Sequence, residues 1–189
     1  MLNTDDFNLR IANVYIEQLS NRDIPQQKAL ITFSGIPGSG KTTLARKLEH
    51  DLNAQYVHHD SLRKIIESEG DDPKRYTMIP ISRIVITTIL NNDANKRIIL
   101  DASIDRSWDV FFNDKKEFGI SQSVIIRLNT PHDVIKQRQL QRDGKINLHF
   151  DEFASQFEAC KREVEADVEL DDNYDYELVL KTVDDLLRD

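Results

Sequence analysis

The sequence contains a single cysteine, Cys160, which excludes a disulfide within the chain. Such sparing use of cysteine is typical of proteins that work in a reducing cytosol. The polar neighbours of Cys160 indicate a small side chain on a charged helix rather than a reactive thiol. We therefore expect Cys160 to be structural.

The sequence also lacks the marks of membrane and secreted proteins. Its best apolar run, RIVITTIL at residues 83–90, is broken by two threonines and is far shorter than the ~20 residues of a membrane span. The first ten residues, MLNTDDFNLR, have neither the basic start nor the apolar core of a secretory signal peptide. We expect a cytoplasmic protein with no membrane partner.

Basic residues are the minority, with 25 Lys and Arg against 33 Asp and Glu and a formal net charge of −8. Proteins that bind a nucleic-acid backbone usually present a basic surface, so this balance disfavours such a partner without excluding it. A single nucleotide needs only a few local groups to hold its phosphates. The charge is therefore compatible with a small phosphorylated ligand.

Short apolar runs alternate with longer helical periods along the chain. The expected strands are 29–33, 54–59, 97–102, 123–128 and 176–180. The expected helices are about 5–20, 41–52, 61–68, 80–91, 108–118, 131–143, 151–166 and 183–188. Five buried strands separated by helices indicate an α/β domain with a mostly parallel sheet covered on both faces. In such a sheet, ligands bind at the carboxyl ends of the strands.

Residues 35–42, GIPGSGKT, match the pattern G-x-x-x-x-G-K-[ST] in full and stand between an expected strand and an expected helix. The glycines let the backbone curl so that successive N–H groups point at one anion, and the helix N-terminus adds its dipole. In this motif Lys41 reaches the β- and γ-phosphates, and the Thr42 hydroxyl ligates Mg²⁺. The predicted nucleotide contacts are Gly35, Pro37, Gly38, Ser39, Gly40, Lys41, Thr42 and Thr43. The segment is predicted to bind a nucleoside triphosphate.

Two classes of nucleotide enzyme find no support in the sequence. A GTPase switch would need an N-K-x-D segment, and ANKRI at residues 94–98 lacks the aspartate. A motor or transporter ATPase would usually be larger and carry its own signature, and none is visible. The remaining class transfers the γ-phosphoryl group to a second, small substrate. A nucleotide-binding regulator that hydrolyses ATP slowly is the alternative from another class.

The acceptor side is predicted where the second expected strand ends, in HHDSLRK at residues 58–64. Asp60 can position and deprotonate an attacking hydroxyl, and its alternative role is that of a helix N-cap. Arg63, one helical turn further on, can bind a substrate anion or remain an exposed charge. For His58 and His59, packing or solvent is favoured over a place in the pocket.

Asp101 ends the apolar run RIILD at residues 97–101, at the expected carboxyl end of the third strand. A carboxylate at that place faces Mg²⁺ or the substrate, and a turn-starting aspartate is the alternative. Arg106, just beyond, is a weaker candidate for an acceptor contact. We thus predict that Thr42 and Asp101 bind the magnesium ion.

A lid is predicted at residues 136–150. Arg138 and Arg142 are four residues apart and so lie on one face of the expected helix. Guanidinium groups on a lid can neutralise the charge of a phosphoryl group in flight while water is excluded. We expect one domain over residues 1–189, with an extra N-terminal helix within 1–22.

In these segments the chain resembles the P-loop small-molecule kinases, which include nucleoside-monophosphate, shikimate and gluconate kinases. The resemblance covers roughly residues 29–145. It is carried by the phosphate loop, DSLR at 60–63, IILDAS at 98–103 and RQLQR at 138–142. It implies a three-layer P-loop NTPase fold with a five-stranded parallel sheet in the order 2-3-1-4-5, ATP with Mg²⁺ as the donor, and a lid that closes over it.

The D-x-x-R segment is most similar to the polynucleotide-kinase and zeta-toxin-like branch, which implies a base at Asp60 and a substrate contact at Arg63. HFDEFASQFE at residues 149–158 resembles the segment after the lid in gluconate kinases. A 5′-hydroxyl polynucleotide kinase is therefore an alternative to a small-molecule kinase, and the acceptor is not named. The N-terminal helix is extra to the minimal fold and is compatible with packing on the sheet edge or with a homodimer contact.

Overall fold

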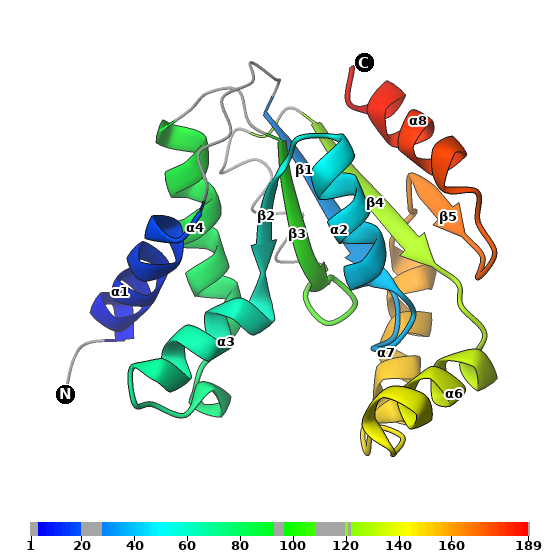
Figure 1. Ribbon diagram of the computed structural model, residues 1–189, viewed down its shortest axis with the longest axis horizontal. Helices are drawn as coiled ribbons and strands as arrows, with labels where there is room; N and C mark the ends of the chain where they lie inside the picture. The colour runs from blue at the N-terminus through cyan, green and yellow to red at the C-terminus, as the bar shows by residue number, and fades with distance from the viewer. Residues whose placement is uncertain (1–3, 20–27, 93–96, 109–119, 121, 189) are drawn as a thin grey trace.

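Five strands form one parallel sheet at the centre of the structure (Figure 1), a computed structural model that describes residues 4–19, 28–92, 97–108, 120 and 122–188. The strands are β1 (Ala29–Ser34), β2 (Gln55–His58), β3 (Arg97–Ser103), β4 (Gln122–Leu128) and β5 (Val168–Leu170). Their order is β2-β3-β1-β4-β5, and every pairing is parallel. The strand order implied by the resemblance is confirmed.

Helices cover both faces of this sheet. They are α1 (Thr4–Glu17), α2 (Lys41–Asp51), α3 (His59–Ser68), the 3₁₀ turn η1 (Pro73–Arg75), α4 (Met78–Asn92), α6 (His132–Asp143), α7 (Phe150–Glu163) and α8 (Tyr176–Leu186). Apolar residues of α1, α3, α4 and the end of α7 form the core on one face, and those of α2 and α8 form the core on the other. β1 is buried along its whole length, because a central parallel strand is covered on both sides.

The helix expected at residues 108–118 lies, apart from its first residue, outside the described residues. Within the described part of the chain, no helix is both long enough and apolar enough to cross a membrane.

The fifth strand was wrongly predicted. Residues 176–180 form the start of α8, and the strand is the short segment 168–170 instead. Asp175 begins the helix, because its Oδ1 accepts hydrogen bonds from the amides of Glu177 at 2.9 Å and Leu178 at 3.3 Å. The apolar residues that looked like a strand lie at helical spacing. The true strand was hidden by acidic neighbours and by its length of three residues.

The register of the sheet gathers the predicted site at one edge. His58, the last residue of β2, stands opposite Asp101 of β3, and the phosphate loop follows the carboxyl end of β1. Side chains alternate between the two faces of a strand, so Tyr56 and His58 point to the opposite face from Val57. Val57 joins the core under α1, and Tyr56 joins the core under α2, the helix that follows the phosphate loop.

Replacing Asp175 tests the corrected assignment of α8. Asp175→Ala removes the acceptor for two amides of the first helical turn and should lower the free energy of unfolding by about 1 kcal/mol. Asp175→Asn keeps an acceptor oxygen and should stay close to the wild type. Urea unfolding followed by circular dichroism measures both variants. Equal stability of the alanine variant and the wild type would contradict the cap.

Candidate active site

The phosphate loop is shaped by close contacts with its neighbours. The amide of Gly35 donates to Oδ2 of Asp105, 3.0 Å away, which fixes the start of the loop to the end of β3. Gly38 has φ of +99°, and a Cβ atom there would lie 3.0 Å from Cγ2 of Ile135 on α6. A side chain at this position would therefore meet both backbone strain and a steric clash. Asp105 was not predicted from the sequence; an acid four residues beyond Asp101 was the available signal.

Lys41 lies at the first position of α2 and folds back over the loop. Its Nζ donates to the carbonyl oxygens of Gly35 at 2.6 Å and Ile36 at 3.0 Å. Burial lowers the pKa of Lys41 to about 8, and the nearby carboxylates of Asp105 and Asp101 oppose this shift only in part. An anion beside Nζ would favour the charged amine, so the position is suited to phosphate.

The predicted site residues converge on one pocket. Its walls come from the phosphate loop, the start of α3, the end of β3, helix α6 and the segment after β5. The predicted residues that line it are Pro37, Gly38, Ser39, Gly40, Lys41, Thr42, Thr43, Asp60, Arg63, Asp101, Arg106, Arg138 and Arg142. Gly35 lies behind the loop rather than in the lining, held by Asp105. The residues that the sequence predicts at the strand ends therefore line one cavity.

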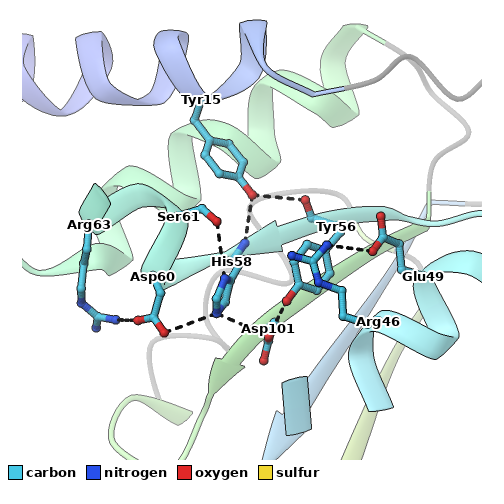
Figure 2. Close-up of polar contacts among 9 residues, drawn as sticks. All are labelled: Tyr15, Arg46, Glu49, Tyr56, His58, Asp60, Ser61, Arg63 and Asp101. Atoms are coloured by element: carbon cyan, nitrogen blue, oxygen red, sulfur yellow. Dashed lines mark hydrogen bonds and ion pairs between the residues drawn. The ribbon is translucent and has the colours of Figure 1, made fainter. Parts of the chain in front are cut away.

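Figure 2 shows how His58 lies between the two predicted carboxylates. Its Nε2 is 3.5 Å from Oδ2 of Asp60 and 3.5 Å from Oδ2 of Asp101. The sequence had favoured packing or solvent for this residue, whereas the structure places it in the pocket lining. The signal was its place at the end of the expected second strand, two residues before Asp60. The imidazole links the expected acceptor side to the expected metal side.

Asp101 is held by a second donor that the sequence did not reveal. The hydroxyl of Tyr56 donates to Oδ2 of Asp101 at 2.5 Å. Burial and this hydrogen bond to a carboxylate raise the pKa of Tyr56, although the guanidinium of Arg46, 3.8 Å from the ring centroid, opposes the shift. The tyrosine therefore stays protonated as a donor. Tyr56 and His58 both contact Oδ2 of Asp101, and Oδ1 has no hydrogen bond within the described part of the chain.

Asp60 and Arg63 form an ion pair one turn apart on α3. Their side chains are 64% and 47% exposed, so the pair contributes little to stability. His59 also lines the pocket: its Nε2 lies 3.2 Å from Oγ of Ser82, and burial lowers its pKa to about 4. The guanidinium of Arg106 lies over the ring of Phe153 on α7, 4.2 Å from its centroid.

The two lid arginines differ in their contacts. Nη1 of Arg138 donates to the carbonyl of Ser39 at 3.4 Å, and Nη2 pairs with Oδ1 of Asp172 at 2.5 Å. Arg142 instead makes two hydrogen bonds to its own neighbour Asp143, at 2.9 and 2.7 Å, and is largely exposed. Both lie on the pocket side of α6, as their spacing predicts, but only Arg138 reaches the phosphate loop.

Gln139 joins the phosphate loop to the segment after α6, and sequence reasoning missed it. Its side chain is almost completely buried. Nε2 donates to the carbonyl of Pro37 at 2.6 Å, and Oε1 accepts from the amide of Asn147 at 2.9 Å. The hydroxyl of Thr130 adds a bond to the carbonyl of Ser39 at 2.9 Å. A glutamine four residues after the buried Ile135 was the only signal in the sequence.

A P-loop fold is the class that this sheet order and this loop define. The model of the family described as AAA domain matches residues 30–166, which is more than half of the chain. The chain belongs to this family. No curated protein matches it.

Solved structures with the same fold are only distantly related in sequence. A gluconokinase from Sinorhizobium meliloti is 15% identical, with 86% of this chain and 93% of that chain covered and a TM-score of 0.53. The APS kinase of Mycobacterium tuberculosis, solved with AMPPNP and APS, is 17% identical over 87% and 100% of the two chains, with a TM-score of 0.56. A tunicamycin resistance protein from Deinococcus radiodurans is 20% identical over 83% and 94%, with a TM-score of 0.56. These likenesses confirm the fold expected for a P-loop small-molecule kinase.

The lowered pKa of Lys41 predicts that binding of a triphosphate takes up a proton. Burial lowers the pKa of Lys41 to about 8, and bound phosphate anions would raise it again. The affinity for AMPPNP should therefore fall as the pH rises from 7 to 9. Calorimetry at pH 8.5 in two buffers of different ionisation enthalpy should detect an uptake of about 0.5–0.8 proton. Lys41→Met is the control and should show no such uptake; its absence in the wild type would contradict the assignment.

Proposed function

We propose that the protein is an ATP-dependent kinase that transfers the γ-phosphoryl group to a hydroxyl of a small-molecule acceptor. The observation that carries this proposal is that one pocket holds a phosphate loop with Lys41 and, across from it, the carboxylates of Asp60 and Asp101 bridged by His58. A phosphate-binding loop alone would also suit a hydrolase or a regulator. Transfer to a hydroxyl also requires a carboxylate near the phosphate loop that can accept the proton of this hydroxyl.

The donor half consists of the loop amides and Lys41. The loop amides and the N-terminus of α2 can hold the β- and γ-phosphates, and Nζ of Lys41 would exchange its two carbonyl partners for phosphate oxygens. Nucleotide use is supported by the M. tuberculosis APS kinase of the same fold, which was solved with AMPPNP. We expect ATP as the donor.

The residues present fit a magnesium ion. Mg²⁺ in phosphoryl-transfer sites usually needs only one or two protein oxygens, because phosphates and water supply the rest. The exposed hydroxyl of Thr42 and Oδ1 of Asp101 line the same pocket and would hold it. Mg²⁺ bound there would neutralise charge on the phosphates. The hydrogen bond from Tyr56 keeps Asp101 in position for this role.

The acceptor half is centred on Asp60. Its carboxylate would accept the proton of the acceptor hydroxyl while the hydroxyl oxygen forms the new bond to phosphorus and ADP leaves. Arg63 is paired with Asp60 in the structure and would turn to an anionic group of the acceptor. Arg138 already contacts the loop and would stabilise the charge of the transferring group, with Arg142 joining it after release from Asp143.

The charges around this half favour a small acceptor over a 5′-hydroxyl oligonucleotide. A basic groove for nucleic acid would combine Arg63, Lys64, Lys74 and Arg75. Of these four residues Arg63 alone lines the pocket, and Arg75 is engaged by Asp71 at 3.6 Å. A regulatory ATPase would not need the acceptor carboxylate.

The experiment is a screen of acceptors that follows ADP release from ATP and Mg²⁺, across nucleosides, nucleotides, sugar acids and 5′-hydroxyl oligonucleotides. A small acceptor should stimulate release in the wild type.

Asp60→Asn should lower kcat with that acceptor by about 10²–10⁴-fold and leave the Kd for AMPPNP unchanged. Lys41→Ala should abolish turnover, because it removes a cation from the developing charge. If Asp60→Asn weakens AMPPNP binding as much as it lowers kcat, the base assignment is wrong, and a protein that no acceptor stimulates is not a kinase of this kind.

A further inference from the structure

The N-terminal helix reaches the active-site end of β2 through Tyr15. This tyrosine is 5% exposed and projects from α1 toward the end of the outer strand (Figure 2). Its Oη accepts a hydrogen bond from the backbone N–H of His58 at 3.0 Å and donates one to the backbone carbonyl of Tyr56 at 3.3 Å. The contact is therefore made to the backbone of the strand that carries the site.

The two hydrogen bonds satisfy backbone groups at the free edge of the sheet. Within the described residues β2 is the outermost strand, and β3 is its one neighbour in the order of the sheet. The backbone groups of alternate residues of an edge strand point away from the sheet and need another partner when they are buried. The hydroxyl of Tyr15 supplies a donor and an acceptor at this point, as an additional strand would. Loss of the hydroxyl would leave both groups without that partner.

The bonded amide belongs to the residue at which the strand turns into helix α3. His58 still has strand geometry, with φ of −130° and ψ of 125°, and the next residue is helical. Its imidazole stands 3.5 Å from each of the carboxylates of Asp60 and Asp101. A shift of the peptide at this turn would change both distances together. The hydroxyl of Tyr15 is therefore bonded to the backbone of the residue whose imidazole lies between the two carboxylates.

A second contact ties the same helix to the same wall of the pocket. The ring of Phe7, two turns before Tyr15 on α1, stacks on the ring of Tyr76, with centroids 4.2 Å apart. Tyr76 lines the pocket directly after η1, which contacts α3, the helix of Asp60, and its hydroxyl donates to Asp71 at 2.6 Å. Helix α1 thus supports the acceptor wall at two places. The phosphate loop follows β1, which is separated from β2 by β3.

We propose that Tyr15 is a positioning residue of the acceptor site: its hydroxyl holds the turn at His58 so that the imidazole stays between Asp60 and Asp101. The effect of Tyr15 on catalysis rests on the proposed kinase function, whereas its effect on the position of His58 does not. Helix α1, which the minimal fold does not require, is in this view a part of the site. The donor side should be independent of it.

The test compares Tyr15→Phe with Ile11→Val in the full-length protein. Phenylalanine removes only the hydroxyl, and Ile11 lies one turn earlier on α1, fully buried in the same core, so its variant loosens the packing and keeps the hydroxyl. The ¹⁵N signals of the His58 imidazole, assigned with His58→Gln, report on its hydrogen bonds. Tyr15→Phe should shift these signals, and Ile11→Val should leave them in place. Unchanged signals in Tyr15→Phe, or equal shifts in both variants, would overturn the proposal.

Activity provides a second readout that a purely structural role would not produce. With water as the only acceptor, Tyr15→Phe should lower the rate of ADP release by about three- to tenfold, the usual range for one lost hydrogen bond. The Kd for AMPPNP should stay within about twofold of the wild type, because the loop is untouched. In a His58→Ala background, Tyr15→Phe should have no further effect, since the two residues act as a unit. Full additivity of the two substitutions, or equal losses in Ile11→Val, would overturn the proposal.

The two proposals fail in different ways. If Asp60→Asn leaves kcat unchanged while the His58 signals still move in Tyr15→Phe, the kinase assignment fails and the positioning of His58 stands. If Asp60→Asn behaves as expected and the His58 signals stay in place, the kinase assignment stands and the role of Tyr15 fails.

Discussion

The candidate site depends on the parallel register of β1, β2 and β3. His58 stands opposite Asp101 across β2 and β3, and the phosphate loop leaves the same edge of the sheet at the end of β1. Groups that are far apart in the sequence therefore meet on strand ends, which are more rigid than loops. Because side chains alternate along a strand, a slip of one residue in β2 would turn Tyr56 and His58 to the opposite face and separate them from Asp101.

The phosphate loop surrounds the buried amine of Lys41, whose positive charge is only partly balanced by neighbouring groups. Two backbone carbonyls accept from Nζ of Lys41, and two aspartates lie nearby, but desolvation still weighs more in its pKa. The loop has little freedom to rearrange, since Asp105 holds its first amide and Gln139 holds the carbonyl of Pro37. Such a loop offers a fixed positive centre, and an arriving phosphate has only to replace two carbonyl contacts.

The sequence was sufficient for the parts of the molecule that local patterns encode. The loop motif, the apolar runs of the first four strands and the acids at their ends predicted an α/β fold with a parallel sheet and placed the phosphate loop, Asp60 and Asp101 in the pocket lining. β5 was missed because three residues between acidic segments carry no periodic signal, and α8 was misread because its first apolar residues also fit a strand. Long-range contacts such as the Tyr56–Asp101 hydrogen bond and the bridge made by Gln139 could not be predicted from the sequence. They depend on which elements pack together rather than on local spacing.

The arginines around the pocket have a common property that bears on the energetics of turnover. In the structure Arg63, Arg138 and Arg142 are each paired with an aspartate. A bound phosphate would compete with these carboxylates, so its affinity reflects an exchange of counter-ions rather than the full attraction of three bare cations. The same carboxylates can recapture the arginines when the products leave. The excess of acidic residues in this chain thus includes carboxylates that would compete with a phosphate ligand for these arginines.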